Sequence, residues 1–161
     1  MTRSRIRLLA VNPRTSLVSE IRIDAPCHRV WDIVAATPRY AEWVINTLAV
    51  TRFDLPRAEP GVTYDERNRI IGPWTARSTW RVISADAPRH TIHEGTGIPL
   101  ATDLRLELTL TPDGDATHYR HVISYAPALG SLGRLIDCVI APSLRRDGRR
   151  TVGNLKALAE S

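Results

Sequence analysis

The order of its periodic segments is the feature that most limits how this chain can fold. Seven segments alternate polar and apolar residues as β-strands do, and only the last segment, residues 129–160, has the pattern of a long helix. An antiparallel sheet buries one apolar face, and no other segment is long enough to cover it. We therefore predict an α+β fold in which a curved, seven-stranded antiparallel sheet surrounds a long C-terminal helix.

The clearest predicted strand is residues 102–111. Its apolar side consists of Leu104, Leu106, Leu108 and Leu110, and we expect this side to face the C-terminal helix. A first strand at residues 17–24 is followed directly by two short helices, one beginning at Pro26 and one running from Thr37 to Trp43. The other strands are predicted at residues 46–54, 63–71, 74–86, 90–95 and 117–126.

The composition indicates one globular domain. Of the 161 residues, 43% are hydrophobic and 24% are charged, which is enough to bury a core without disulfides. Cys27 and Cys138 are far apart in sequence, which argues against a disulfide framework and favours a reducing, cytoplasmic location. No apolar stretch approaches the ~20 residues of a membrane-spanning helix, so we expect no membrane insertion. Residues 1–15 are predicted to be a loose basic leader and residues 16–161 the domain.

Three sets of motifs accompany this order of elements. They are Glu20–Pro26 with Val30-Trp31 and Tyr40-x-x-Trp43; Gly61-x-x-Tyr64-x-x-Arg67-Asn68-Arg69; and Tyr125-x-Pro127, Leu132–Asp137 and Asn154-Leu155-Lys156. In these residues, from Ser16 to Glu160, the chain resembles the START/SRPBCC superfamily and, within it, the polyketide cyclase/dehydrase-like branch. The resemblance implies a helix-grip (START-like) fold that holds an apolar small molecule between sheet and helix.

Familiar catalytic motifs are absent from the sequence. It contains no phosphate-binding loop and no nucleophile elbow. His90 and His93 are three apart on a predicted strand, so they point to opposite faces and cannot share a metal ion. We do not expect either cysteine to act as a nucleophile. We therefore expect no metal and no cofactor, and candidate chemistry falls to polar side chains that the strands turn inward.

His121 is the first such side chain. It alternates with Tyr119, Ile123 and Tyr125 on one face of the last predicted strand, and that face is mostly apolar, so we expect it to point inward. An inward histidine could act as acid or base near neutral pH. The alternative is a hydrogen-bonded histidine with a structural role.

Glu66 is the second candidate for an inward polar side chain. On the predicted strand 63–71 it shares a face with Tyr64, Asn68 and Ile70. A three-residue loop after this strand would bring Trp74, Ala76, Ser78, Trp80 and Val82 to the same face, which is the arrangement we favour. A two-residue loop would bring Thr75, Arg77, Thr79 and Arg81 instead, and a bulge would shift either pattern. Inside an apolar pocket, Glu66 would have a raised pKa. The alternative is a surface carboxylate paired with Arg67 or Arg81.

The resemblance, together with these residues, implies an enzyme of natural-product biosynthesis that cyclises or dehydrates a polyketide-like substrate by acid/base catalysis. His121 and Glu66 are the candidate acid and base, and Tyr64 is a candidate hydrogen-bond donor. The predicted ligand-binding residues are Asn68, Trp74, Ser78, Trp80, Leu104, Leu106, Leu108, Tyr119, Ile123, Tyr125, Leu132, Ile136 and Val139. The alternative is a carrier or sensor that binds a lipid, quinone or aromatic metabolite without transforming it.

Basic residues near the C-terminus suggest a partner. Arg145, Arg146, Arg149 and Arg150 would form a ridge on the last helix that could dock an acidic acyl carrier protein. The same ridge could simply be a solvated helix face. We expect no nucleic-acid partner, because aromatic residues do not interleave the arginines.

Overall fold

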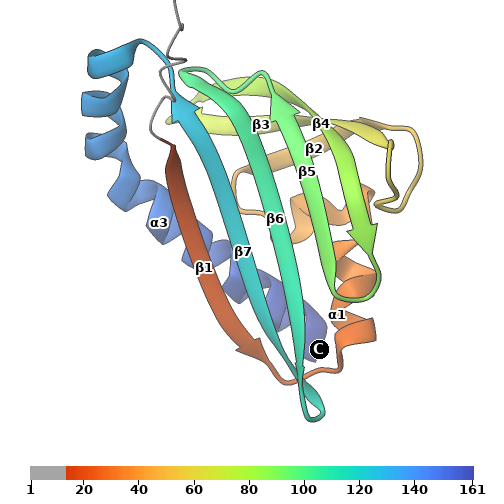
Figure 1. The fold of residues 1–161 in the computed structure, drawn as a ribbon. Helices are drawn as coiled ribbons and strands as arrows, with labels where there is room; N and C mark the ends of the chain where they lie inside the picture. Colours follow the sequence, from red (N-terminus) through yellow and green to blue (C-terminus); the bar gives the residue numbers. More distant parts are fainter. Residues whose placement is uncertain (1–13) are drawn as a thin grey trace, which may run out of the picture.

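The structure is a computed structural model that describes residues 14–161, so residues 1–13 of the predicted leader lie outside it. Its centre is one antiparallel sheet in which strands follow the order β1-β7-β6-β5-β4-β3-β2 (Figure 1). The strands are β1 (Thr15–Ile23), β2 (Thr47–Phe53), β3 (Thr63–Ile71), β4 (Trp74–Asp86), β5 (His90–Thr96), β6 (Ala101–Asp113) and β7 (Ala116–Pro127).

Four helical segments complete the fold. They are α1 (Cys27–Val34), the 3-10 helix η1 (Thr37–Arg39), α2 (Tyr40–Trp43) and α3 (Gly130–Glu160). The short helices follow β1, and α3 runs beside β1 and β7 toward α1 (Figure 1). This arrangement confirms the predicted helix-grip fold. None of the helices within residues 14–161 is long and apolar enough to cross a membrane.

The turn between β3 and β4 decides which side chains share a face. Ile71 pairs with Trp74 across a two-residue turn, and the register shifts between Arg69 and Ile71. This bulge adds one residue to β3, so Glu66 faces Ser78 and Tyr64 faces Trp80. The favoured face is therefore confirmed, although a bulge and a short turn produce it rather than a three-residue loop.

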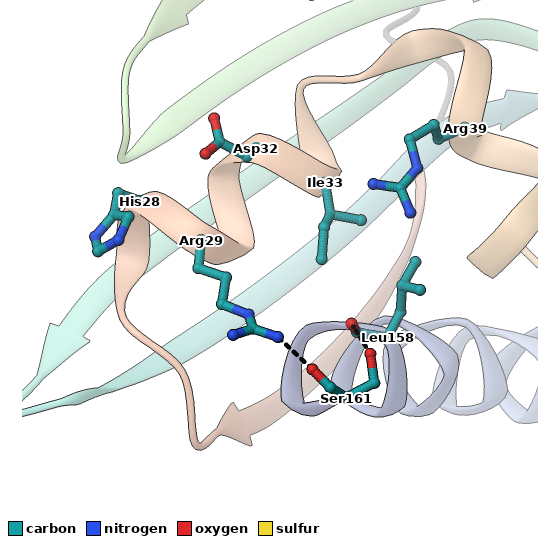
Figure 2. Close-up of a pocket in the computed structure, with 7 residues that line it drawn as sticks. All are labelled: His28, Arg29, Asp32, Ile33, Arg39, Leu158 and Ser161. Atoms are coloured by element: carbon teal, nitrogen blue, oxygen red, sulfur yellow. Dashed lines mark hydrogen bonds between the residues drawn. The ribbon is translucent and has the colours of Figure 1, made fainter.

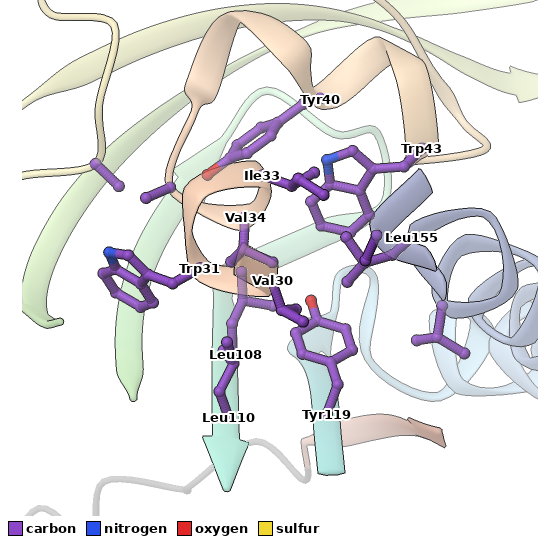
Figure 3. Close-up of a cluster of buried hydrophobic side chains, with 14 of the residues drawn as sticks. Val30, Trp31, Ile33, Val34, Tyr40, Trp43, Leu108, Leu110, Tyr119 and Leu155 are labelled. Carbon is purple, nitrogen blue, oxygen red and sulfur yellow. The ribbon is translucent and has the colours of Figure 1, made fainter. Parts of the chain in front are cut away.

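The core lies where α1 and the second half of α3 pack against the sheet. Leu108 and Tyr119 from the sheet meet Val30 of α1 and Leu155 of α3 in one buried cluster (Figure 3). Leu104 and Leu110 are also buried, as the leucine alternation of β6 predicts, whereas Leu106 is only half-buried.

The first half of α3 turns a different face to the sheet from the one predicted. Leu132 is 59% exposed and Val139 is 74% exposed, Leu135 is exposed as well, and Ile136 is half-buried. The hydroxyls of Thr15 and Tyr125 donate to the carboxylate of Asp137, and these bonds set the rotation of the helix. The buried residues of α3 follow that phase: Gly133, Ala141, Thr151, Val152, Leu155 and Ala159.

Candidate functional site

A polar cluster on the inner face of the sheet surrounds Glu66. Its side chain is 6% exposed, and no basic side chain among residues 14–161 pairs with it. Burial raises the pKa of Glu66 to about 7, against the opposing effect of nearby hydrogen-bond donors. These donors belong to Trp80, Asn68, Thr47 and Ser78. Glu66 is therefore the buried carboxyl of the two sequence alternatives, and it titrates near neutral pH.

The hydrogen bonds around Ser78 orient its hydroxyl. Its oxygen accepts one bond from the Asn68 amide at 2.7 Å and another from the Trp80 indole N–H at 2.9 Å. Because both lone pairs are used, the Ser78 proton is left to donate. Glu66 lies directly opposite Ser78 across the two strands, so its carboxyl is placed to accept that proton.

Trp80 owes its position to a glycine on the next strand. Gly95 pairs with Trp80, and a Cβ at residue 95 would lie 2.6 Å from the indole ring. Any side chain at this position would displace the ring that donates to Ser78.

Replacing Gly95 with alanine should shift Trp80, change its fluorescence and destabilise the domain by about 1–3 kcal/mol, because overpacking forces side chains off their preferred positions. Tryptophan emission and urea unfolding would measure both effects. Gly153→Ala is the matched control: that position of α3 has open space around it, and alanine should stabilise the helix by up to ~1 kcal/mol. Unchanged emission in Gly95→Ala would contradict the packing described here.

A second chain of hydrogen bonds joins Tyr64 to His93. The Thr91 hydroxyl donates its only proton to the carbonyl oxygen of Ser84 at 2.9 Å. It must therefore accept a hydrogen bond from His93 Nε2, also at 2.9 Å. His93 Nδ1 is then the acceptor for the Tyr64 hydroxyl at 2.8 Å. Burial lowers the pKa of His93 to about 4, which keeps the ring neutral.

This chain changes the roles expected from the sequence. The Tyr64 proton is directed at His93, so Tyr64 is not placed to donate it to a ligand. His93 was considered in the sequence only as a metal ligand, and its inner position follows from the alternation of Thr91, His93 and Gly95 on β5. His90 lies on the other face beside Glu107, as predicted.

His121 faces inward from β7, between Ser19 of β1 and Leu108 of β6. Burial lowers its pKa to about 4, so the ring is neutral near pH 7. Three strands, β4 to β6, separate its strand from that of Glu66 in the sheet. The two candidate acid/base residues therefore lie on different flanks of the inner face and do not form a pair.

The remaining predicted binding residues fall into three groups. Those on the inner face are Asn68, Ser78 and Trp80, within the polar cluster, and Leu104, Leu106, Ile123 and Tyr125, toward β6 and β7; Ile136 of α3 is half-buried. Leu108 and Tyr119 are fully buried within the core. Trp74 continues the face of Ser78 and Trp80 but is 76% exposed at the end of β4, and Leu132 and Val139 are exposed on α3, so the structure does not enclose these three side chains.

A pocket of about 500 Å³ lies elsewhere, between α1 and the end of α3 (Figure 2). It is lined by His28, Arg29, Asp32, Ile33, Arg39, Leu158 and Ser161. Two of its basic side chains already have partners, since Arg29 donates to the Ser161 carbonyl and Arg39 binds Glu42. Across the part of the chain that the structure describes, no group of three or more His, Cys, Asp or Glu side chains could hold a metal ion.

The sheet curves around a long helix and carries a buried carboxyl on its inner face. This arrangement defines a ligand-binding domain of the helix-grip class. The chain belongs to the family described as polyketide cyclase / dehydrase and lipid transport, which its sequence matches over residues 14–160. This membership confirms the resemblance seen in the motifs. No curated protein matches the chain.

Solved structures agree with the fold. The Zhui aromatase/cyclase from Streptomyces sp. R1128 matches with a TM-score of 0.74 and 16% identity, over 92% of this chain and 94% of that one. Protein CV1439 from Chromobacterium violaceum matches with a TM-score of 0.69 and 16% identity, over 91% and 97%. Ara h 8.0201 matches with a TM-score of 0.66 and 6% identity, over 91% and 98%. At these identities the likeness concerns the fold.

Proposed function

We propose that the chain binds a small, largely apolar molecule on the inner face of the sheet and promotes proton transfer at a carbonyl-activated carbon of that molecule. The observation that carries this proposal is Glu66, a buried carboxyl with a pKa near 7 and no ion-pair partner within residues 14–161. The family description and the fold shared with an aromatase/cyclase support a polyketide-like substrate.

The chemistry follows from the titration of Glu66. Its ionised form removes a proton from a carbon beside a carbonyl, and the resulting enolate attacks a second carbonyl of the same folded chain. The protonated Glu66 gives that proton to the alkoxide formed by the attack, which completes the ring closure and restores the carboxylate. In a second cycle the carboxylate removes a proton from the carbon between the carbonyl and the new alcohol, a carbon–carbon double bond forms, and the proton passes to the hydroxyl, which leaves as water. Ser78, opposite Glu66, is placed to donate a hydrogen bond that holds the carboxyl. The neutral His121, on the other flank, would bind a polar group farther along the substrate.

The test is turnover of an untethered poly-β-ketone surrogate by wild type and Glu66→Gln. We expect the variant to lose about 100-fold in rate, since general acid/base catalysis contributes on that order. The wild-type rate should follow one ionisation near pH 7. Glu94→Gln, an exposed carboxylate on β5, is the control and should leave the rate unchanged. A product pattern equal to that of the uncatalysed reaction would refute the enzymatic role.

One observation favours a carrier as the second candidate. Glu66 and His121 do not converge on one point, and a carrier needs no such pair. A carrier should keep most of its ligand affinity when both residues are changed to alanine, whereas an enzyme should still bind but stop turning over. Binding of a fluorescent apolar probe, measured beside turnover, separates these outcomes.

An acyl carrier protein remains a proposed partner for the enzymatic role. Arg145, Arg146, Arg149 and Arg150 are exposed on α3, as the predicted ridge requires. Their charge would attract an acidic carrier that delivers a tethered substrate.

A further inference from the structure

One end of the sheet carries an unusual concentration of exposed apolar side chains. The β3–β4 turn, the β5–β6 connection and the start of α3 all lie at this end, uppermost in Figure 1. We call it the apolar end. Its exposed large apolar residues are Ile71, Trp74, Leu100, Leu129, Leu132 and Leu135.

The backbone holds two of these leucines in conformations that leucine rarely adopts. Leu100 has a φ of 63° and Leu129 a φ of 64°, both in the left-handed region. Such conformations cost free energy, and they concentrate at functional sites. Here both belong to connections that display their side chains to solvent rather than burying them.

The charge of the apolar end is positive. Arg69, Arg77 and Arg134 are exposed there, and none of them forms an ion pair with another residue among 14–161. Asp103, at the start of β6, supplies an exposed carboxylate on the same end, and its backbone carbonyl accepts a bond from Arg14. Exposed apolar side chains flanked by basic ones are complementary to a surface whose outer layer is negatively charged and whose interior is apolar.

We propose that the apolar end docks on the surface of a lipid bilayer with anionic headgroups. The apolar side chains come from three separate connections and stand on turns and a helix start, which suits insertion among headgroups. Tryptophan favours this interfacial depth, and arginines beside it bind lipid phosphates. Peripheral docking of this kind needs no spanning helix. It is independent of the chemistry proposed for Glu66.

Trp74 makes the proposal directly measurable. The other three tryptophans, Trp31, Trp43 and Trp80, are buried, so a blue shift of emission on adding vesicles reports on Trp74. We expect the shift, and co-sedimentation, with phosphatidylcholine vesicles that contain about 30% phosphatidylglycerol, and much less with phosphatidylcholine alone.

Substitutions then test the two components separately. Trp74→Ser should weaken vesicle binding about ten-fold through lost apolar contact. Arg69→Glu with Arg77→Glu should weaken it by about five-fold or more per site and remove its salt dependence. Phe53→Ser, an exposed apolar residue at the opposite end of the sheet, is the control and should bind like wild type.

Two results would overturn the proposal. One is equal binding of wild type and Trp74→Ser to anionic vesicles, and the other is no binding of wild type to them. If the wild type instead sediments as a dimer that Trp74→Ser dissociates, and vesicles do not compete with that dimer, the apolar end is an interface between two copies of the chain.

Discussion

Replacing Leu108 with aspartate should leave the domain unfolded at 25 °C. The side chain is 0% exposed and lies in the core cluster with Val30 and Tyr119 (Figure 3). The substitution removes a buried leucine, at about 2–5 kcal/mol, and adds a carboxylate that must stay protonated or remain unpaired, at several kcal/mol more. This sum approaches the whole stability of a typical domain, about 5–15 kcal/mol.

Circular dichroism and urea unfolding would measure the loss. Leu106→Asp is the matched comparison, because Leu106 lies two residues away on the same face but is only half-buried. We expect it to be clearly less harmful than Leu108→Asp, although the leucine alternation alone does not distinguish the two positions. A folded Leu108→Asp protein with an unchanged melting temperature would contradict the burial seen here.

Glu66→Gln should remove the pH dependence that Glu66 imposes on stability. Folding raises the pKa of this carboxyl from 4.5 to about 7, so the folded state holds its proton more tightly than the unfolded state does. The resulting stabilisation is fully present below pH 4.5 and is lost as the pH rises through 7. Over that window wild type should lose about 3 kcal/mol relative to Glu66→Gln, since one pKa unit corresponds to about 1.4 kcal/mol.

Urea unfolding of both proteins at a series of pH values between 4.5 and 8 would show this difference. His93 and His121 act in the opposite direction, because their lowered pKa values make stability fall as the pH drops from 6.5 toward 4. They are present in both proteins, so their effect cancels in the comparison. Stability curves that stay parallel across the range would show that Glu66 is not buried as described.

The fold was predictable because the strands alternate polar and apolar residues and only one predicted helix is long enough to cover the sheet. The phase of that helix was not predictable. The apolar residues of its first half favour a face with Leu132 and Val139 toward the sheet, whereas Asp137 lies on that side, bonded to Thr15 and Tyr125. Thr15 and Asp137 are 122 positions apart, and such a contact leaves no trace in local periodicity.

The polar cluster was only partly predictable for a similar reason. Alternation placed Glu66 and Asn68 on one face, but the bulge between Arg69 and Ile71 decided that Ser78 and Trp80 join them. The role of Tyr64 depended on His93, which lies two strands away in the sheet. Hydrogen-bond direction is a property of the assembled chain of partners, and sequence spacing does not contain it.

The chain from Tyr64 through His93 to Thr91 has a consequence for proton traffic. It ends on the backbone carbonyl of Ser84, which can accept a hydrogen bond but cannot pass a proton onward. This chain of hydrogen bonds therefore ends inside the protein and cannot conduct a proton. Any proton that moves during a reaction on the inner face must be exchanged by Glu66 or His121 themselves, through the ligand or through water that enters beside it.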